Sequence, residues 1–192
     1  MEILSFCQNL DGNLLLWIQE NLRSEFLTPL FRFVTTTGNA GLLWIVMTCF
    51  LLVFKRTRKV GTMCAISLIL SLIFTNLLIK PIAARTRPYE LIEGLHILIA
   101  KPHDFSFPSG HSSAAFAAAW VIFRRLKKKF GIPALIYASI MAFSRLYLGV
   151  HYPTDVLAGI LLGILYAITA MWFVERVIFM RKQKENEPQE NR

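Results

Sequence analysis

The chain has 192 residues, of which 55% are hydrophobic, and its mean hydropathy is +0.49. This composition excludes an ordinary soluble domain and indicates a single domain embedded in a membrane. The formal net charge of +9 would suggest nucleic acid as a partner of a soluble protein. In a membrane protein, Lys and Arg gather in the loops on one side. We therefore expect a lipid bilayer as the partner, and no nucleic acid.

Residues 1–37 read as an amphipathic N-terminal segment. Apolar residues recur at spacings of three to five, while charged residues interrupt both apolar runs. Such a pattern favours a position in the membrane interface over a crossing. Pro29 should bend or break the segment, and the polar residues 35–39 are typical of a turn.

Five apolar runs follow and predict membrane spans at residues 40–54, 60–79, 108–123, 131–150 and 152–179. The fold class is therefore all-α: a polytopic membrane helical bundle with five clear transmembrane helices plus an N-terminal amphipathic or sixth helix. The third run is rich in small residues, and Gly159 and Gly163 are spaced for close helix packing. We expect one domain over 1–192, with the bundle at 38–180 and a polar, disordered tail at 181–192.

Basic residues orient this bundle. Clusters of Lys and Arg at 55–59, 124–129 and 176–184 fall on one side if the spans alternate. By the positive-inside rule that side is cytoplasmic, together with the C-terminus. Residues 80–107 and His151 are then extracytoplasmic, in a protein integral to the cell membrane.

Two polar clusters stand at the outer ends of the second and third spans. Lys80 and Arg87 belong to the first, where basic side chains often only snorkel to the interface. Ser109, Gly110 and His111 open the third span, where free N–H groups of a helix N-terminus bind anions such as phosphate. Taken alone, this second cluster is equally consistent with a simple helix cap.

The third cluster consists of Arg145, His151 and Asp155 in strongly apolar surroundings. Ionisable groups near membrane depth are costly and are functional candidates for that reason. His151 and Asp155 are four residues apart, so they face the same side of a helix. A carboxylate that binds one imidazole nitrogen fixes the tautomer and leaves the other nitrogen as a nucleophile or base.

All three clusters lie at outer span ends, which predicts a single site. Its cations, helix N–H groups and two histidines match phosphoryl transfer, in which cations neutralise phosphate oxygens while one group attacks and another protonates the leaving oxygen. The sequence contains no carboxylate cluster typical of Mg²⁺ or Zn²⁺. We therefore expect a metal-independent enzyme with no metal site and no cofactor.

These clusters resemble the three-part signature of the type 2 phosphatidic acid phosphatase family, which includes membrane lipid phosphatases, glucose-6-phosphatase and soluble vanadium haloperoxidases. The matching motifs are Lys80-x6-Arg87-Pro88, Pro108-Ser109-Gly110-His111 and Ser144-Arg145-x5-His151-x3-Asp155. They are intact, in order, and span residues 80–155. The family usually has six spans, so the amphipathic segment 1–37 departs from its pattern.

The resemblance implies a role for each motif residue. His151 would be the nucleophile that forms a phosphohistidine, and Asp155 would orient it. His111 would protonate the leaving oxygen and then help to activate water. The phosphate would be held by Lys80, Arg87, Arg145, the Ser109 hydroxyl and the Gly110 N–H.

The function expected on this basis is hydrolysis of a lipid phosphomonoester or the terminal phosphate of a lipid diphosphate on the extracytoplasmic face. Substrate candidates are undecaprenyl diphosphate, phosphatidylglycerophosphate and phosphatidic acid. Two alternatives stay open: a sugar-phosphate phosphatase with the same site, and a non-catalytic transporter or scaffold of the same fold. The natural substrate, the preference for mono- or diphosphate, and the oligomeric state are not determined by the sequence.

Other polar residues of the outer loop receive simpler interpretations. His96 and His103 are expected to be loop residues, and Asp104 to make a turn or cap bond. Arg85 either contacts a second phosphate or lies in the lipid headgroup layer.

Overall fold

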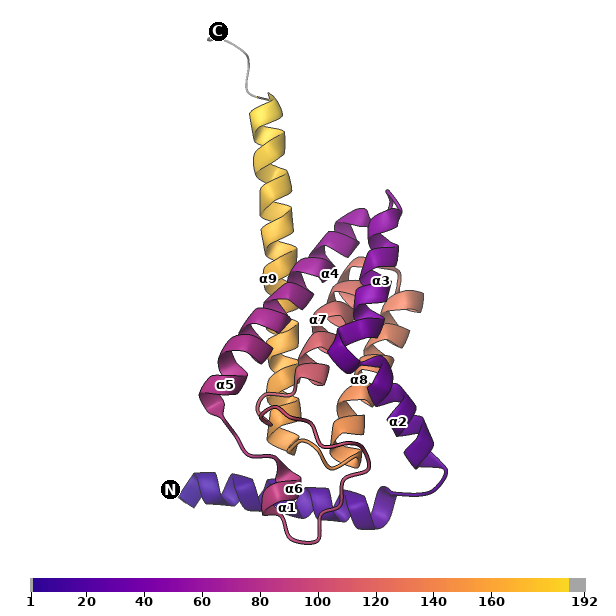
Figure 1. Ribbon diagram of the computed structural model, residues 1–192. Coiled ribbons are helices and arrows are strands. Elements are labelled where there is room, and N and C mark those ends of the chain that lie inside the picture. The colour runs from indigo at the N-terminus through magenta and orange to yellow at the C-terminus, as the bar shows by residue number, and fades with distance from the viewer. Residues whose placement is uncertain (1, 187–192) are drawn as a thin grey trace.

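The computed structural model describes residues 2–186, and within this range the secondary structure is entirely helical (Figure 1). The elements are α1 (Glu2–Leu22), α2 (Leu27–Thr37), η1 (Asn39–Gly41), α3 (Leu42–Val53), α4 (Arg58–Leu70), η2 (Ser71–Ile79), α5 (Lys80–Ala83), α6 (Pro88–Leu91), α7 (Gly110–Arg125), α8 (Lys128–Tyr147) and α9 (Pro153–Asn186). The predicted all-α class is confirmed.

Helix α1 runs across the end of the bundle, beside α6, instead of along the bundle helices (Figure 1). Arg23, just after α1, fastens this end of the segment to two distant carbonyls. Its Nε donates to the Tyr147 oxygen at 2.9 Å and its Nη1 to the His96 oxygen at 2.7 Å. This placement agrees with an interfacial N-terminal helix.

The chain from α1 to α3 refines two predictions. Segment 1–37 breaks at residues 23–26, between α1 and α2, and Pro29 lies just after this break in the first turn of α2, where its missing N–H has no helical acceptor. The predicted turn at 35–39 begins later, since α2 continues to Thr37. The break falls at η1, where Ala40 and Gly41 have left-handed φ values of 50° and 71°. The α2 helix and the η1–α3 helix are bent by 51° there.

Helix α7 lies inside the bundle and packs against α4, α8 and α9. Its contact with α9 is close because α9 presents glycine. A Cβ at Gly163 would lie 2.5 Å from the Ser113 oxygen, and one at Gly159 would lie 2.6 Å from the Ser109 oxygen. The predicted packing role of this glycine pair is confirmed. Helix α7 itself is rich in small, buried side chains: Ser112, Ser113, Ala115, Ala117, Ala118 and Ala119.

Judged by helix length and composition, fewer segments qualify as membrane spans than the five predicted. Within residues 2–186, the helical segments Arg58–Leu91, Lys128–Tyr147 and Pro153–Ile178 are long and apolar enough to cross a membrane, and the bent α2–α3 pair is a possible fourth span. Helix α7 has 16 residues, about 24 Å of helix, against a hydrocarbon core of about 30 Å. Its small and polar residues serve contact with other helices, so the count of five is not confirmed.

The second predicted span changes its helical geometry before it reaches the outer end. After α4, the chain forms the π-helix η2 and then the short helix α5, which ends at Ala84 in a left-handed conformation. Hydroxyl groups fasten η2 to α7. The Ser113 Oγ lies 2.8 Å from the Ser71 Oγ and 3.0 Å from the Thr75 Oγ1.

The C-terminal helix is longer than predicted. Helix α9 continues to Asn186, so the first part of the tail expected at 181–192 is helical and not disordered. Residues 187–192 of that tail lie outside the described residues.

Candidate active site

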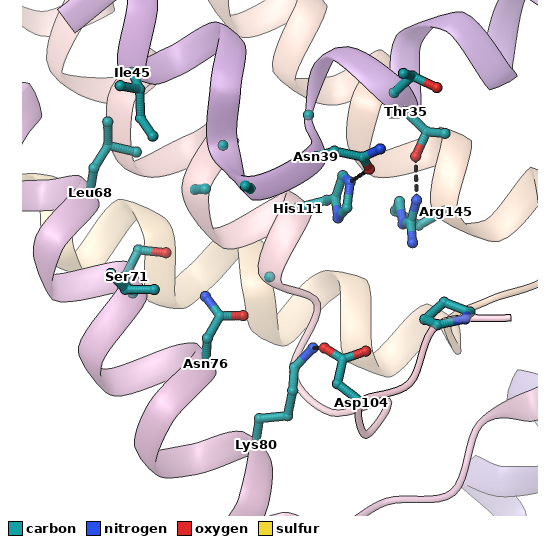
Figure 2. A pocket seen from close by; sticks show the side chains of 18 of the residues that line it. Thr35, Asn39, Ile45, Leu68, Ser71, Asn76, Lys80, Asp104, His111 and Arg145 are labelled. Atoms are coloured by element: carbon teal, nitrogen blue, oxygen red, sulfur yellow. Dashed lines mark hydrogen bonds and ion pairs between the residues drawn. The ribbon is translucent and has the colours of Figure 1, made fainter. Parts of the chain in front are cut away.

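A cavity of about 950 Å³ opens where the α2–α3 junction, η2, the start of α7 and the outer loop meet (Figure 2). Six of the eight predicted site residues line it: Lys80, Arg87, Gly110, His111, Arg145 and His151. The three sequence clusters therefore meet in one place, as expected from their positions at span ends.

His151 is buried between Asp155 and the cavity. Its Nδ1 lies 3.4 Å from the Asp155 Oδ2, while its Nε2 lies 3.5 Å from the Arg87 Nη1. Burial lowers the pKa of the imidazole, and the charges of Arg145 and Arg87 lower it further, against the opposing effect of Asp155. At neutral pH the ring is therefore uncharged, and Nε2 faces the cation-lined side of the site.

Asp155 is fully buried and receives several donors. Its Oδ1 accepts a hydrogen bond from the Arg85 Nη1 at 2.6 Å. Its Oδ2 accepts from the Ser106 hydroxyl and from the Tyr152 N–H, the latter at 2.9 Å. These donors fix the carboxylate against the Nδ1 side of His151.

Arg85 holds Asp155 in place. This role differs from the two predicted for Arg85, which were contact with a second phosphate and a position in the lipid headgroup layer. Its Nη2 pairs with the Asp11 Oδ2 of α1 at 2.9 Å, and its guanidinium lies 3.9 Å from the centre of the Tyr152 ring. The same Asp11 oxygen accepts from the Thr154 hydroxyl near the start of α9. Arg85 thus connects the N-terminal helix to the carboxylate that contacts His151, and it does not line the cavity.

The cavity carries an excess of positive charge. The Lys80 Nζ and the Arg87 Nη2 each lie 2.5 Å from an oxygen of Asp104. Arg145 forms no ion pair within residues 2–186; its Nη1 donates to the Thr35 hydroxyl, and its buried Nε has no hydrogen-bond partner. A buried cation without an anion is costly. The arrangement therefore favours an anionic ligand.

Asp104 makes ion pairs in place of the expected turn or cap bond. Burial alone would raise the pKa of its carboxyl, but the hydrogen bonds and charges of Lys80 and Arg87 outweigh that effect and lower the pKa to about 2. The side chain is ionised at physiological pH and 53% exposed. His96 and His103 lie in the same outer loop, as predicted.

His111 lies in the first turn of α7 and contacts the α2–α3 junction (Figure 2). Its Nε2 is 3.2 Å from the Asn39 Oδ1. Because a side-chain carbonyl oxygen can only accept, this contact favours the tautomer with its proton on Nε2. The ring can give a proton to a ligand only as an imidazolium, which carries a hydrogen on both nitrogens.

The start of α7 departs from the prediction at Ser109. This hydroxyl is buried, caps the helix by accepting from the Ser112 N–H, and does not line the cavity. Gly110 does line the cavity. A Cβ at this position would lie 2.4 Å from the Asn76 Oδ1, so glycine is needed for the Asn76 side chain to pack over the helix end.

The sequence profile of the PAP2 superfamily matches residues 60–179. The chain belongs to this superfamily. It is 38% identical to an undecaprenyl-diphosphatase of Sulfolobus acidocaldarius over 120 residues, which are 62% of this chain and 58% of that protein. The chain thus spans little more than half the length of this curated relative.

Two crystal structures are similar to this PAP2 protein over most of its length. LpxE of Aquifex aeolicus has a TM-score of 0.74 and 27% identity, covering 83% of this chain and 93% of that one. A transmembrane PAP2-type phosphatidylglycerolphosphate phosphatase from Bacillus subtilis has a TM-score of 0.72 and 27% identity, covering 88% and 87%. The apolar helices and these relatives make the chain a membrane protein of the PAP2 superfamily.

The same cavity continues from the charged end into an apolar arm between α3 and α4. Residues of both helices and of the start of η2 line this arm: Ile45, Leu52, Ala65, Leu68, Ile69 and Leu72. A ligand that fills the whole cavity therefore combines a compact anionic group with a hydrocarbon portion.

Sequence reasoning missed several polar residues that contact the PAP2 motifs. Asp11, Thr35, Asn39 and Ser106 are single residues without a motif, so only the fold reveals them. Asn76 is the exception, because a lone amide inside the apolar run of η2 is itself a signal of a polar surface. Within residues 2–186, no group of three or more His, Cys, Asp or Glu side chains is placed to hold a metal ion.

Proposed function

We propose that this PAP2 protein is a membrane lipid phosphatase. It removes a phosphomonoester or the terminal phosphate of a lipid diphosphate. The observation that carries the proposal is the single cavity that joins three cationic side chains and two histidines to an apolar arm. Support comes from the relatives, which include an undecaprenyl-diphosphatase and a phosphatidylglycerolphosphate phosphatase.

The first step is transfer of the phosphoryl group to His151. Its Nε2 attacks phosphorus while the bond from phosphorus to the leaving oxygen breaks in line. His111, as an imidazolium, gives one of its two N–H protons to that oxygen and becomes a neutral imidazole. Charge on the phosphoryl oxygens is neutralised by the cations of the cavity and by the free N–H groups of α7. Those cations are Lys80, Arg87 and Arg145.

The second step returns the site to its starting state. Water attacks phosphorus, its proton passes to His111, and the bond from phosphorus to the His151 nitrogen breaks. Asp155 holds the Nδ1–H of His151 and stabilises the positive charge that the ring carries in the phosphohistidine. The products are inorganic phosphate and a lipid alcohol or lipid monophosphate.

The proposal includes the expected topology. Five spans are counted if α3 and α7 are included despite their short lengths, and the active site then faces the extracytoplasmic side. Figure 1 supports this orientation, since the α3–α4 connection and the C-terminal end of α9 lie at the opposite end from α1, α5 and α6. The basic residues 55–59 lie in that α3–α4 connection, where the cytoplasm is expected.

A substrate panel tests the proposal against its alternatives. Undecaprenyl diphosphate, phosphatidylglycerophosphate and phosphatidic acid are expected to release phosphate faster than glucose 6-phosphate, because only lipids fill the apolar arm. The activity should persist in EDTA, since side-chain cations neutralise the phosphate. A rate that EDTA abolishes and Mg²⁺ restores would contradict the metal-independent step, and a protein that turns over no substrate would be a transporter or scaffold.

Replacement of the nucleophile tests the chemistry. His151→Ala should lower kcat by at least about 1000-fold, because no other side chain takes over the attack. The matched control is His96→Ala, which removes a loop imidazole outside the cavity and should leave kcat within about twofold. In the unaltered enzyme, rapid acid-free quenching should trap phosphate on His151, and mass spectrometry would locate it. Equal rates for H151A and the unaltered enzyme would rule out the phosphohistidine.

A further inference from the structure

The Asp104 carboxylate is bound to Lys80 and Arg87, two of the cations that hold the phosphate in the proposed function. We propose that its carboxylate is an internal counter-anion, which neutralises Lys80 and Arg87 in the empty site and is displaced whenever phosphate binds. The inference rests on the proposed function, because it concerns the phosphate end of the same cavity. It makes Asp104 a residue that sets the affinity for substrate and product.

The geometry places Asp104 where phosphate oxygens are needed. Its Oδ2 lies 2.5 Å from the Lys80 Nζ (Figure 2), and its Oδ1 lies 2.5 Å from the Arg87 Nη2. Two oxygens on one carbon thus bridge two cations, which is how two oxygens on one phosphorus would bridge them. All three residues line the cavity that also contains His151.

Phosphate and the Asp104 carboxylate cannot both bind Lys80 and Arg87 at the same time. Phosphorus bonded to the His151 Nε2 has its oxygens within reach of Arg87, whose Nη1 is only 3.5 Å from that nitrogen. A second anion beside the ionised Asp104 carboxylate meets strong repulsion at such distances in a buried site. The carboxylate, on the Arg87 Nη2, and the phosphate, beside the Arg87 Nη1, therefore compete for the charge of the same cations.

The Asp104 side chain can move away from Lys80 and Arg87 while the backbone of its loop stays in place. The Asp104 carbonyl accepts from the Arg87 Nε at 2.8 Å, and the next backbone contact joins the Ser106 N–H to the Arg85 oxygen at 2.8 Å. These bonds hold the backbone in place. The side chain itself is 53% exposed, so a change of side-chain rotamer releases the two cations and places the carboxylate in solvent.

The exchange has a consequence for turnover. When inorganic phosphate leaves, the returning carboxylate satisfies Lys80 and Arg87, so the empty state is not penalised by unpaired buried cations. Asp104 therefore weakens phosphate binding and speeds product release. Its removal should trap the product.

Calorimetric titration with inorganic phosphate tests this directly, with full-length protein in detergent. The isosteric change Asp104→Asn should lower the Kd for phosphate by about tenfold or more, because a competing negative charge is removed. The Ki for product inhibition should fall in parallel. Glu93→Gln is the matched control, since it removes one exposed carboxylate from the same outer loop without touching the cavity, and its Kd should stay within about twofold.

The outcomes separate this inference from the proposed function. An unchanged or higher Kd in D104N, with unaltered protein that binds phosphate, overturns the inference, since it means that Asp104 only holds the cations in position. If neither protein binds phosphate nor hydrolyses a lipid phosphate, the proposed function and the inference fall together. Asp104→Ser provides a second neutral variant if D104N does not fold, and it should show the same lower Kd.

Discussion

Two regions of the chain build this site and differ in what they supply. Residues 60–179, which match the PAP2 superfamily, contain every reactive group and every cation of the cavity. Helices α1 to α3 precede that match and contribute no cation. They contribute Asp11 to the Arg85 tether, the Thr35 hydroxyl to Arg145 and the Asn39 amide to His111.

In the proposed function, the motifs provide the reactive groups and the N-terminal helices orient them. Each of the three N-terminal contacts reaches a different motif side chain or its tether: Arg85, which binds Asp155, then Arg145, and His111. If this division is correct, changes in the N-terminal region should affect rate constants through geometry and leave the identity of the reaction unchanged.

The largest expected effect concerns the tether from α1 to Asp155. Arg85→Met should lower kcat by about 100-fold with little change in KM, because Asp155 loses its closest nitrogen donor and no longer holds His151. Arg85→Lys should recover part of kcat, since it keeps the charge. Steady-state kinetics that separate kcat from KM test this. A higher KM at unchanged kcat would assign Arg85 to phosphate binding.

The same tether can be broken from its N-terminal side, which serves as the control. Asp11→Asn removes the charge that holds Arg85 and should lower kcat by about tenfold. In the double variant, the two losses should combine to less than their product, because both act through one contact chain. If the two losses multiply, α1 does not act on Asp155 through Arg85.

A smaller effect is expected at Thr35. Thr35→Val removes the hydroxyl that holds the Arg145 guanidinium and should lower kcat/KM by about tenfold. The charge of Arg145 helps to lower the His151 pKa, and only the neutral imidazole attacks. If the guanidinium moves away, that pKa rises, and the acid limb of the kcat/KM profile shifts to higher pH. A pH profile of the two proteins measures the shift; an acid limb at lower pH would contradict it.

The smallest effect is expected at Asn39. Asn39→Leu removes the acceptor for the His111 Nε2 proton and should lower kcat by about threefold to fivefold for a lipid alcohol leaving group. With p-nitrophenyl phosphate the loss should vanish, because that leaving group needs no proton. Asn21→Leu, at the exposed end of α1, is the control for an equivalent surface change. Equal losses for both substrates would place Asn39 in folding and not in proton transfer.

The motif residues could be located from the sequence because a charged residue inside an apolar stretch has few explanations other than a functional one. The spacing of His151 and Asp155 predicts that they lie close together, and they do, although His151 precedes α9 and is not on a helix face with Asp155. Lys80 stands at the end of an apolar run. The fold brings these residues together as expected. Ser109 shows the limit of such reasoning, since a serine that precedes a helix can cap it or bind a ligand, and only the direction of its hydroxyl decides.

The partners of the motif residues could not be predicted, because they depend on contacts between distant segments. Nothing in the sequence connects Asp11 to Arg85, or Asp104 to Lys80, since each pair is separated by a long stretch of chain. The interpretation of residues 108–123 as a membrane span meets a related limit, because α7 has the predicted length of 16 residues but is packed against other helices. Apolar small residues such as Ala117 and Ala118 raise hydropathy equally whether they face lipid or another helix.

The π-helix η2 has a consequence for the evolution of this chain. Leu72, Asn76 and Lys80 are spaced by four residues and all line the cavity, along a segment that is π-helical from Ser71 to Ile79. In a helix, loss or gain of one residue rotates everything beyond it by about 100°. A single deletion between Ser71 and Lys80 would turn the ammonium group out of the site. We expect this segment to accept many substitutions but no insertion or deletion.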